Sequence, residues 1–198
     1  MSRRRELMAA LTGGNSDLLY ERRNLAVETG AQIDTGVKPF TVGQSITILI
    51  DFTNTENPTG EGAVASKWKL IRIYSVALSL YTLVLGKTDR ASSALKFWFY
   101  EALSAGMTMD NNLLSNLTRK RVAITHEAGS NTAYIKYKMG ESGTLRSYSR
   151  TKTFTADDTV LTFGGPAEGD HALPAGTFDL IQVWGKVLTD DEINSFFE

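Results

Sequence analysis

Alternating apolar and polar positions define the clearest elements of this chain. Within residues 45–52, isoleucine or phenylalanine fills every second position, and this period of two predicts a half-buried β-strand. Short segments of similar character predict further strands over residues 32–36, 68–74, 78–85, 95–100, 121–126, 133–138, 145–154 and 159–165. The strand at 32–36 is expected to be the first, and residues 101–118 are expected to be irregular.

The last segment of the chain changes from a strand period to a helical one. One face of the predicted strand carries Phe178, Leu180, Gln182 and Trp184. The other face carries Asp179, Ile181 and Val183. Thr189 is placed as a helix N-cap, and Glu192 three residues later completes a capping box. Asp190 and Asp191 add negative charge at the positive end of the helix dipole.

About ten to twelve short strands and one helix predict an all-β protein. Antiparallel strands with one apolar and one polar face pack as a two-layered β-sandwich. The 198 residues are expected to form one such domain. No strand–helix–strand rhythm and no internal repeat point to another class.

The closing segment also carries a motif of the form G-x-[IF]-D-x-[VI]-x-[VI]-[WY]-x-x-x-L-[ST]-x-x-E-[IL]. It is supplied by Gly176, Phe178, Asp179, Ile181, Val183, Trp184, Leu188, Thr189, Glu192 and Ile193. This segment resembles the last strand and closing helix of concanavalin A-like (laminin-G-like) jelly rolls. The resemblance implies a jelly-roll β-sandwich sealed by Trp184, Leu188, Thr189, Glu192 and Ile193. That family includes lectins, glycosidases, adhesins and structural modules, so the fold alone selects no function.

A second resemblance concerns the beginning of the chain. Residues 32–39, Gln-Ile-Asp-Thr-Gly-Val-Lys-Pro, and the arginine-rich opening before Leu7 resemble jelly-roll domains of phage and prophage structural proteins and of related bacterial surface proteins. The resemblance implies a virion protein of the head surface, tail or fibre. In the central hairpin, Lys138-Met139-Gly140 replaces the Val-Asp-Gly of many members, so no ligand role of that aspartate is carried over.

Composition narrows the choice of class and compartment. The chain has no cysteine, which excludes disulfides, thiolate zinc sites and a cysteine nucleophile. The net charge of −1 does not indicate direct binding of nucleic acid. No apolar run is long enough to span a membrane, and the opening does not have the pattern of a signal peptide. These features fit assembly in a reducing bacterial cytoplasm, as expected for the virion protein that the resemblance implies.

Charge is distributed unevenly along the chain. Residues 1–23 contain five arginines: Arg3, Arg4, Arg5, Arg22 and Arg23. Residues 157–198 contain nine acids against Lys186 alone. This asymmetry suits contact between copies or with other virion proteins, although two solvated faces would show the same pattern. We expect residues 1–24 to form a basic docking arm and residues 25–198 to form the sandwich.

Candidate catalytic groups are sparse. Jelly-roll glycosidases place several carboxylates on one strand face, whereas the only Glu-x-Asp here is Glu168-Gly-Asp170 in a Gly/Pro loop without a third acid. Asp190, Asp191 and Glu192 point about 100° apart on a helix and do not converge. The sequence therefore predicts no enzymatic activity and leaves a glycoside hydrolase as a distant alternative.

Metal and cofactor sites are equally weakly indicated. His126 and His171 are the only histidines, too few for a zinc site without cysteine, and we expect both to be structural or solvated. Laminin-G-like modules sometimes bind calcium at their rim, which makes Asp157, Asp158 and Asp170 weak calcium candidates. No other cofactor is expected.

Aromatic residues raise the question of sugar binding. Trp68, Trp98, Trp184 and the seven tyrosines could stack on sugars if they are exposed, but the tryptophans are expected in the core. We therefore hold two hypotheses. The first is a non-enzymatic phage virion protein, a head decoration, tail or fibre component whose displayed jelly roll could bind surface glycans. The alternative is a carbohydrate-binding or adhesin module of a bacterial surface protein.

Overall fold

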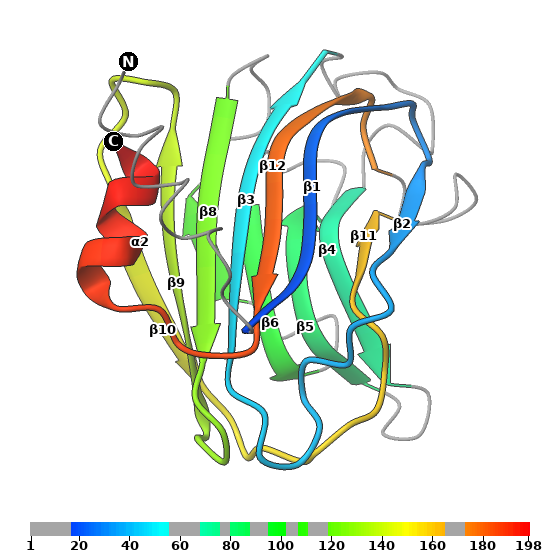
Figure 1. Cartoon of the computed structure of the whole chain (residues 1–198), viewed down its shortest axis with the longest axis vertical. Coiled ribbons are helices and arrows are strands. Elements are labelled where there is room, and N and C mark those ends of the chain that lie inside the picture. The colour runs from blue at the N-terminus through cyan, green and yellow to red at the C-terminus, as the bar shows by residue number, and fades with distance from the viewer. Residues whose placement is uncertain are drawn as a thin grey trace.

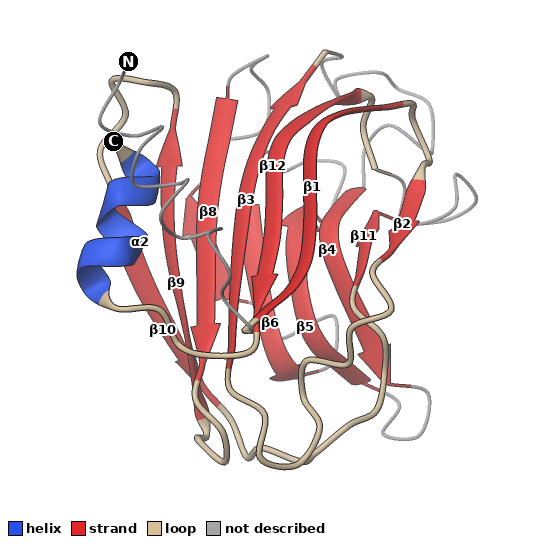
Figure 2. Cartoon of the chain, in the orientation of Figure 1, coloured by secondary structure: helices blue, strands red, loops and turns tan. Residues whose placement is uncertain are grey.

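The computed structural model describes residues 17–55, 68–75, 80–87, 95–101, 107–110, 119–164 and 173–198. Within these ranges the chain forms two stacked antiparallel sheets of six strands each and one short helix (Figures 1 and 2). This architecture confirms the predicted jelly-roll β-sandwich. No helix of the described residues is long and apolar enough to cross a membrane.

Each sheet joins strands that are distant in sequence to a run of consecutive strands. Sheet A has the order β1 (Leu18–Val27), β12 (Gly176–Trp184), β3 (Ile46–Asn54), β8 (Arg119–His126), β9 (Thr132–Met139), β10 (Arg146–Thr151). Sheet B has the order β2 (Gln32–Asp34), β11 (Thr162–Gly164), β4 (Trp68–Ser75), β5 (Leu80–Lys87), β6 (Leu95–Glu101), β7 (Met107–Asp110). The strand β7 lies within residues 101–118, which were expected to be irregular.

The main core lies between the sheets and is built by the alternation seen in β3. Ile46, Ile48, Ile50 and Phe52 are all fully buried there. The ring of Phe52 lies 4.6 Å from that of Phe178 between centroids. Sheet B contributes its own buried residues, Leu70, Ile71, Leu83, Leu85, Phe97, Phe99 and Phe163.

The strand β12 departs from strict alternation through a β-bulge. Phe178 pairs with Phe52 and Leu180 with the adjacent Asp51, so Asp179 is an extra residue in the ladder. Phe178 therefore joins the main core between the sheets. Leu180 and Trp184 lie on the outer face of sheet A, where they are buried in a second cluster. The prediction that Phe178 shares a face with Leu180 and Trp184 is wrong, because the bulge shifts the register between them.

The helix α2 (Asp190–Phe197) covers part of the outer face of sheet A, as Figure 1 shows. Ile193, Phe196 and Phe197 pack there in a second cluster with Trp184 and Leu49. The predicted capping box is confirmed: the Thr189 hydroxyl accepts from the Glu192 N–H at 3.3 Å, and the Glu192 carboxylate accepts from the Thr189 N–H at 2.7 Å.

Replacing Thr189 by alanine removes this cap and is expected to cost about 1 kcal/mol of folding stability. Urea unfolding of Thr189→Ala measures the loss. Thr144→Ala is the matched control, because Thr144 is exposed in the loop between β9 and β10 and should change stability by less than about 0.5 kcal/mol. Equal losses in the two variants would show that the capping box contributes nothing specific.

The first strand of the fold begins earlier than the sequence indicated. β1 precedes β2, the strand expected to be first, and pairs with β12 along Leu18–Val27. The expected boundary between residues 24 and 25 falls inside β1, so the sandwich includes Arg22 and Arg23. Asn24, at φ 51°, interrupts the extended backbone there.

Candidate functional site

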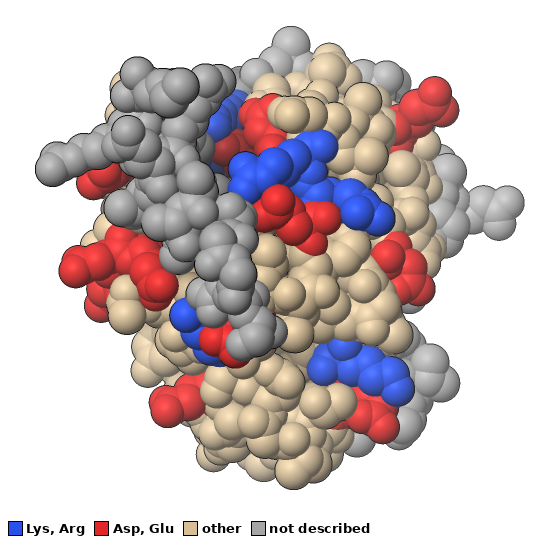
Figure 3. All heavy atoms as spheres, in the orientation of Figure 1, with Lys and Arg blue, Asp and Glu red and all other residues tan. Residues whose placement is uncertain are grey.

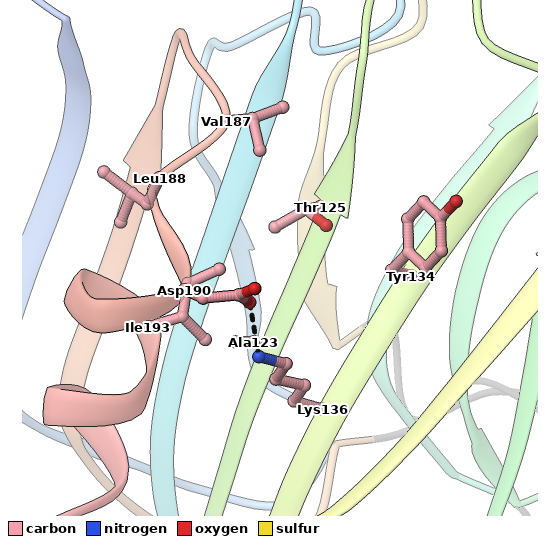
Figure 4. A pocket seen from close by; sticks show the side chains of 8 residues that line it. All are labelled: Ala123, Thr125, Tyr134, Lys136, Val187, Leu188, Asp190 and Ile193. Atoms are coloured by element: carbon pink, nitrogen blue, oxygen red, sulfur yellow. Dashed lines mark hydrogen bonds and ion pairs between the residues drawn. The ribbon is translucent and has the colours of Figure 1, made fainter.

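A pocket of about 320 Å³ lies on the outer face of sheet A, between α2 and strands β8 and β9 (Figure 4). Eight residues line it: Ala123, Thr125, Tyr134, Lys136, Val187, Leu188, Asp190 and Ile193. They come from β8, from β9, from the loop after β12, and from α2. Only the folded chain brings these segments together.

The floor and one wall of the pocket are small or apolar. Ala123 lies opposite Lys136 in the β8–β9 ladder, and Thr125 lies opposite Tyr134. The short side chain of Ala123 leaves space in front of the sheet. Leu188 and Ile193 are buried on the α2 side. Figure 4 shows Tyr134 and Val187 on opposite sides of Thr125.

Tyr134 places an exposed aromatic ring at the edge of this pocket. Its neighbours Ala133 and Ile135 point into the core and are fully buried, so the alternation of β9 turns Tyr134 outward. The residue is 56% exposed. An aromatic ring in this position offers an apolar surface and a hydroxyl group to a ligand.

Lys136 and Asp190 supply the charged groups of the pocket. The Lys136 ammonium donates to Asp190 Oδ1 at 2.7 Å, the contact drawn as a dashed line in Figure 4. It also lies 3.4 Å from Asn194 Oδ1. The hydrogen bond from Lys136, with its charge, lowers the pKa of Asp190. A donor and an acceptor therefore stand side by side above an apolar floor, an arrangement suited to a small polyhydroxylated ligand.

The candidate docking residues Arg22 and Arg23 have local partners in β1. Arg23 donates from Nε to Glu21 Oε1 at 2.8 Å, and the Arg22 guanidinium lies 5.3 Å from the centre of the Tyr20 ring. Burial alone would raise the pKa of Glu21. The hydrogen bonds from Arg23 and Gln182 lower it by more than that, so the pKa lies below its ordinary value. Both arginines remain exposed.

A second group of charges lies on the same sheet face. Asp51 binds the Arg119 guanidinium at two points, one of them Nε to Oδ1 at 2.7 Å. Glu141 contacts both Arg119, at 2.5 Å, and Arg121, at 3.2 Å. The hydrogen bond with Asp51 raises the pKa of Arg119. Figure 3 shows basic and acidic side chains beside one another on this face rather than in separate patches.

Two of the calcium candidates can be placed. Asp157 Oδ1 accepts from the N–H and hydroxyl of Thr159, at 3.0 and 2.7 Å, and so caps a turn. Asp158 is exposed. Among the described residues, no three acidic or histidine side chains gather in a group that could hold a metal ion.

His126 lies in the core, in agreement with a structural role. Its Nε2 lies 2.8 Å from the Ser130 carbonyl oxygen and donates to it. Its ring stacks on that of Phe154 at 4.8 Å and contacts Phe40 and Phe99. The Nδ1 atom is buried and has no hydrogen-bond partner in the described parts of the chain. Burial lowers the pKa of His126.

This environment makes the fold sensitive to mild acid. The unfolded chain protonates His126 near its ordinary pKa of about 6.5, whereas the folded chain resists protonation. Stability should therefore fall as the pH drops from about 6.5 toward the lowered pKa of the folded state. Urea unfolding at pH 7.0 and 5.5 measures the loss, and it should shrink in His126→Phe. An unchanged pH dependence in this variant would assign the loss to other groups.

The residues predicted to close the fold lie at the end of β12, in the segment that follows it and in α2. Trp184 is fully buried, Thr189 and Glu192 form the cap, and Leu188, just before α2, and Ile193, within it, are buried in the second cluster. Two of these residues, Leu188 and Ile193, also line the pocket. Sequence reasoning did not identify Tyr134, Lys136 and Asp190 as a site. The one usable signal was a tyrosine at an outward position of a strongly alternating strand.

Several predicted features lie outside the described residues. These are Arg3, Arg4 and Arg5, the calcium candidate Asp170, the Glu168–Asp170 pair and His171. The side chains of Trp68 and Trp98 also lie outside them, although their backbones belong to β4 and β6. The docking arm and the third calcium candidate therefore stay predictions.

Comparison with solved structures finds domains of similar fold. No model of a known protein family matches the chain, and no curated protein matches it in sequence. Among solved structures, it is similar to the CBM40 domain of the Ruminococcus gnavus IT-sialidase bound to α2,3-sialyllactose, with a TM-score of 0.58 and 15% identity. That match covers 89% of this chain and 96% of the other.

Two whole sialidases contain a similar domain. The leech intramolecular trans-sialidase matches with a TM-score of 0.57 and 15% identity over 92% of this chain. The NanB sialidase of Streptococcus pneumoniae matches with a TM-score of 0.58 and 14% identity over 90% of it. The chain spans 28% of each of these enzymes. The chain therefore has a β-sandwich fold similar to that of the CBM40 domain of the Ruminococcus gnavus IT-sialidase.

Proposed function

We propose that this chain is a non-catalytic carbohydrate-binding module and that the pocket between α2 and strands β8 and β9 takes a sugar. The observation that carries the proposal is the exposed ring of Tyr134 beside the Lys136–Asp190 pair, in a fold shared with carbohydrate-binding domains. The fold likeness by itself does not select a function. The pocket adds a place with suitable chemistry.

A sugar ring presents hydroxyl groups around its edge and C–H groups on its faces. The pocket offers a matching division: a ring at Tyr134 and an apolar floor at Ala123 and Ile193 for the faces, with Lys136 and Asp190 for the hydroxyls. Ligand pockets commonly combine an apolar lining with a few placed polar groups. A single weak site also gains strength when many copies are displayed together.

The Tyr134→Ala variant is expected to lose at least about tenfold in glycan affinity, equivalent to about 1.4 kcal/mol. Binding is measured on a broad glycan array and then by calorimetry on the strongest ligand. Val42→Ala is the control, because Val42 is 87% exposed, lies in the loop before β3 and is not among the lining residues. If Tyr134→Ala retains full glycan binding, the pocket is not the binding site. If the parent protein binds no glycan, the proposed function is wrong.

The phage virion role has no support in the comparisons, and we propose the carbohydrate-binding alternative in its place. A location on a virus particle, contact with other virion proteins and assembly in the bacterial cytoplasm stay predictions from the resemblance of the opening segment. The glycoside hydrolase alternative depended on Glu168 and Asp170, which lie outside the described residues.

A further inference from the structure

We infer that the pocket selects an uncharged sugar over one that bears a carboxylate, an inference that rests on the proposed function. The lining contains one cation, Lys136, and one anion, Asp190, and the two are already paired at 2.7 Å. A ligand carboxylate that accepts from the Lys136 ammonium would lie beside the Asp190 carboxylate, and the lining residues include no second cation to offset the repulsion between the two.

The other charged residues near the pocket also disfavour a ligand that bears a carboxylate. Asp191 and Glu192 follow Asp190 in the first turn of α2; Asp190 and Asp191 are exposed, and Glu192 is partly exposed. Like charges placed close together oppose binding.

Two further cations lie near these elements but do not line the pocket. Lys138, two positions after Lys136 in β9, donates to the Phe197 carbonyl at 3.3 Å. Lys186 lies 5.8 Å from the centre of the Trp184 ring and 3.9 Å from Asp17.

The N-terminus of α2 does not offer an anion site either. Free N–H groups at a helix start attract anions, but here the capping box is closed. The Thr189 hydroxyl accepts from the Glu192 N–H, and the Ile193 N–H donates to the Thr189 carbonyl at 3.0 Å. The acidic side chains of this turn already complement the helix dipole.

A neutral diol suits the same groups without displacing any of them. One hydroxyl can accept from the Lys136 ammonium while its neighbour donates to the Asp190 carboxylate, and such charge-assisted hydrogen bonds are stronger than neutral ones. Asn194 lies 3.4 Å from Lys136 and adds an amide at this edge. The ion pair thereby recognises two adjacent hydroxyls of an uncharged sugar.

The surface beyond Tyr134 extends the site toward the edge of sheet A. In the β9–β10 ladder, Ser149 lies opposite Tyr134 and Ser147 opposite Lys136. Residues directly opposite in an antiparallel pair share one face, and both serines are exposed. A second sugar unit that leaves the pocket over Tyr134 would meet these hydroxyls. We therefore infer a neutral oligosaccharide of at least two units.

The test uses an array that carries neutral glycans and the same glycans extended by a terminal sialic acid. Neutral members are expected to bind, and addition of the acidic sugar over the recognised end is expected to reduce the signal at least about tenfold. Asp190→Asn and Lys136→Met should each weaken neutral binding by a similar factor. Asp158→Asn, an exposed aspartate in the loop before β11, is the matched control and should bind like the parent. Circular dichroism confirms that each variant is folded.

Three outcomes would overturn the inference, and they separate it from the proposed function. Preferred binding of the acidic members, abolished by Lys136→Met, would refute selection of uncharged sugars and leave the carbohydrate-binding function intact. Binding that tolerates both Asp190→Asn and Tyr134→Ala would move the site elsewhere and also leave that function intact. A folded protein that binds neither set would refute both proposals.

Discussion

Replacing Trp184 by alanine is expected to lower the free energy of unfolding by about 3–5 kcal/mol, the usual cost of truncating a buried tryptophan. Trp184 is fully buried at the end of β12, in the cluster that joins sheet A to α2. Its partners there include Leu49, Leu188 and Phe196. Removal of the indole leaves a cavity under the helix. Because the whole free energy of unfolding of a domain is only about 5–15 kcal/mol, the variant should be marginally stable.

Chemical denaturation of Trp184→Ala and of Val187→Ala tests this expectation. Val187 lies three residues further along the same segment and is 43% exposed, so its truncation should cost less than about 0.5 kcal/mol. Amide hydrogen exchange adds a local measure, since α2 should lose protection in the tryptophan variant. A loss below about 1 kcal/mol would show that α2 does not depend on this contact.

Replacing Asp51 by alanine is expected to cost about 3 kcal/mol, near the lower end of the range for removing one partner of a buried ion pair. The Asp51 side chain is only 2% exposed and binds the Arg119 guanidinium, which is 26% exposed. Arg121 lies two residues away on the same face and is 1% exposed. Glu141 contacts both arginines, but its side chain is 65% exposed, so it replaces the buried Asp51 carboxylate poorly.

Asp179→Asn is the control for this effect. Asp179 lies 3.9 Å from Arg119 Nε, but its side chain is 45% exposed, and exposed ion pairs contribute about 0–1 kcal/mol. Denaturation midpoints of the two variants, measured at low and high salt, compare the buried pair with the exposed one. If Asp51→Ala loses no more stability than Asp179→Asn, the buried pair does not stabilise the fold.

Local patterns predicted the parts of this fold that local interactions build. The alternation of β3 and the capping box of Thr189 and Glu192 need only neighbouring residues, and both are present in the structure. The closing motif through Trp184 also predicted the class of fold. These elements carry their signals within about ten residues.

Features that depend on distant partners were missed. β1 contains three consecutive charged residues, Glu21, Arg22 and Arg23, and such a run is typical of a solvated segment. In the structure, Glu21 accepts hydrogen bonds from Gln182 of β12 and from Arg23. The bulge at Asp179 exists only in the ladder with β3. No local signal reports either pairing.

The pocket was missed for the same reason, because it too depends on residues distant in sequence. Lys136 and Asp190 are 54 positions apart in sequence, and the sequence shows each as an ordinary surface charge. Their contact requires α2 to pack across sheet A beside β9. Asp190 was correctly read as a favourable residue at the helix start, and its second role depends on the strand that the helix meets.

The most direct test is a nuclear magnetic resonance titration of the protein with the neutral glycan that gives the strongest array signal. The account predicts that the largest amide shift changes fall in β8, in β9 around Tyr134 and Lys136, and at the start of α2 around Asp190. Saturable changes confined to sheet B, or to the β1 edge of sheet A, would contradict it.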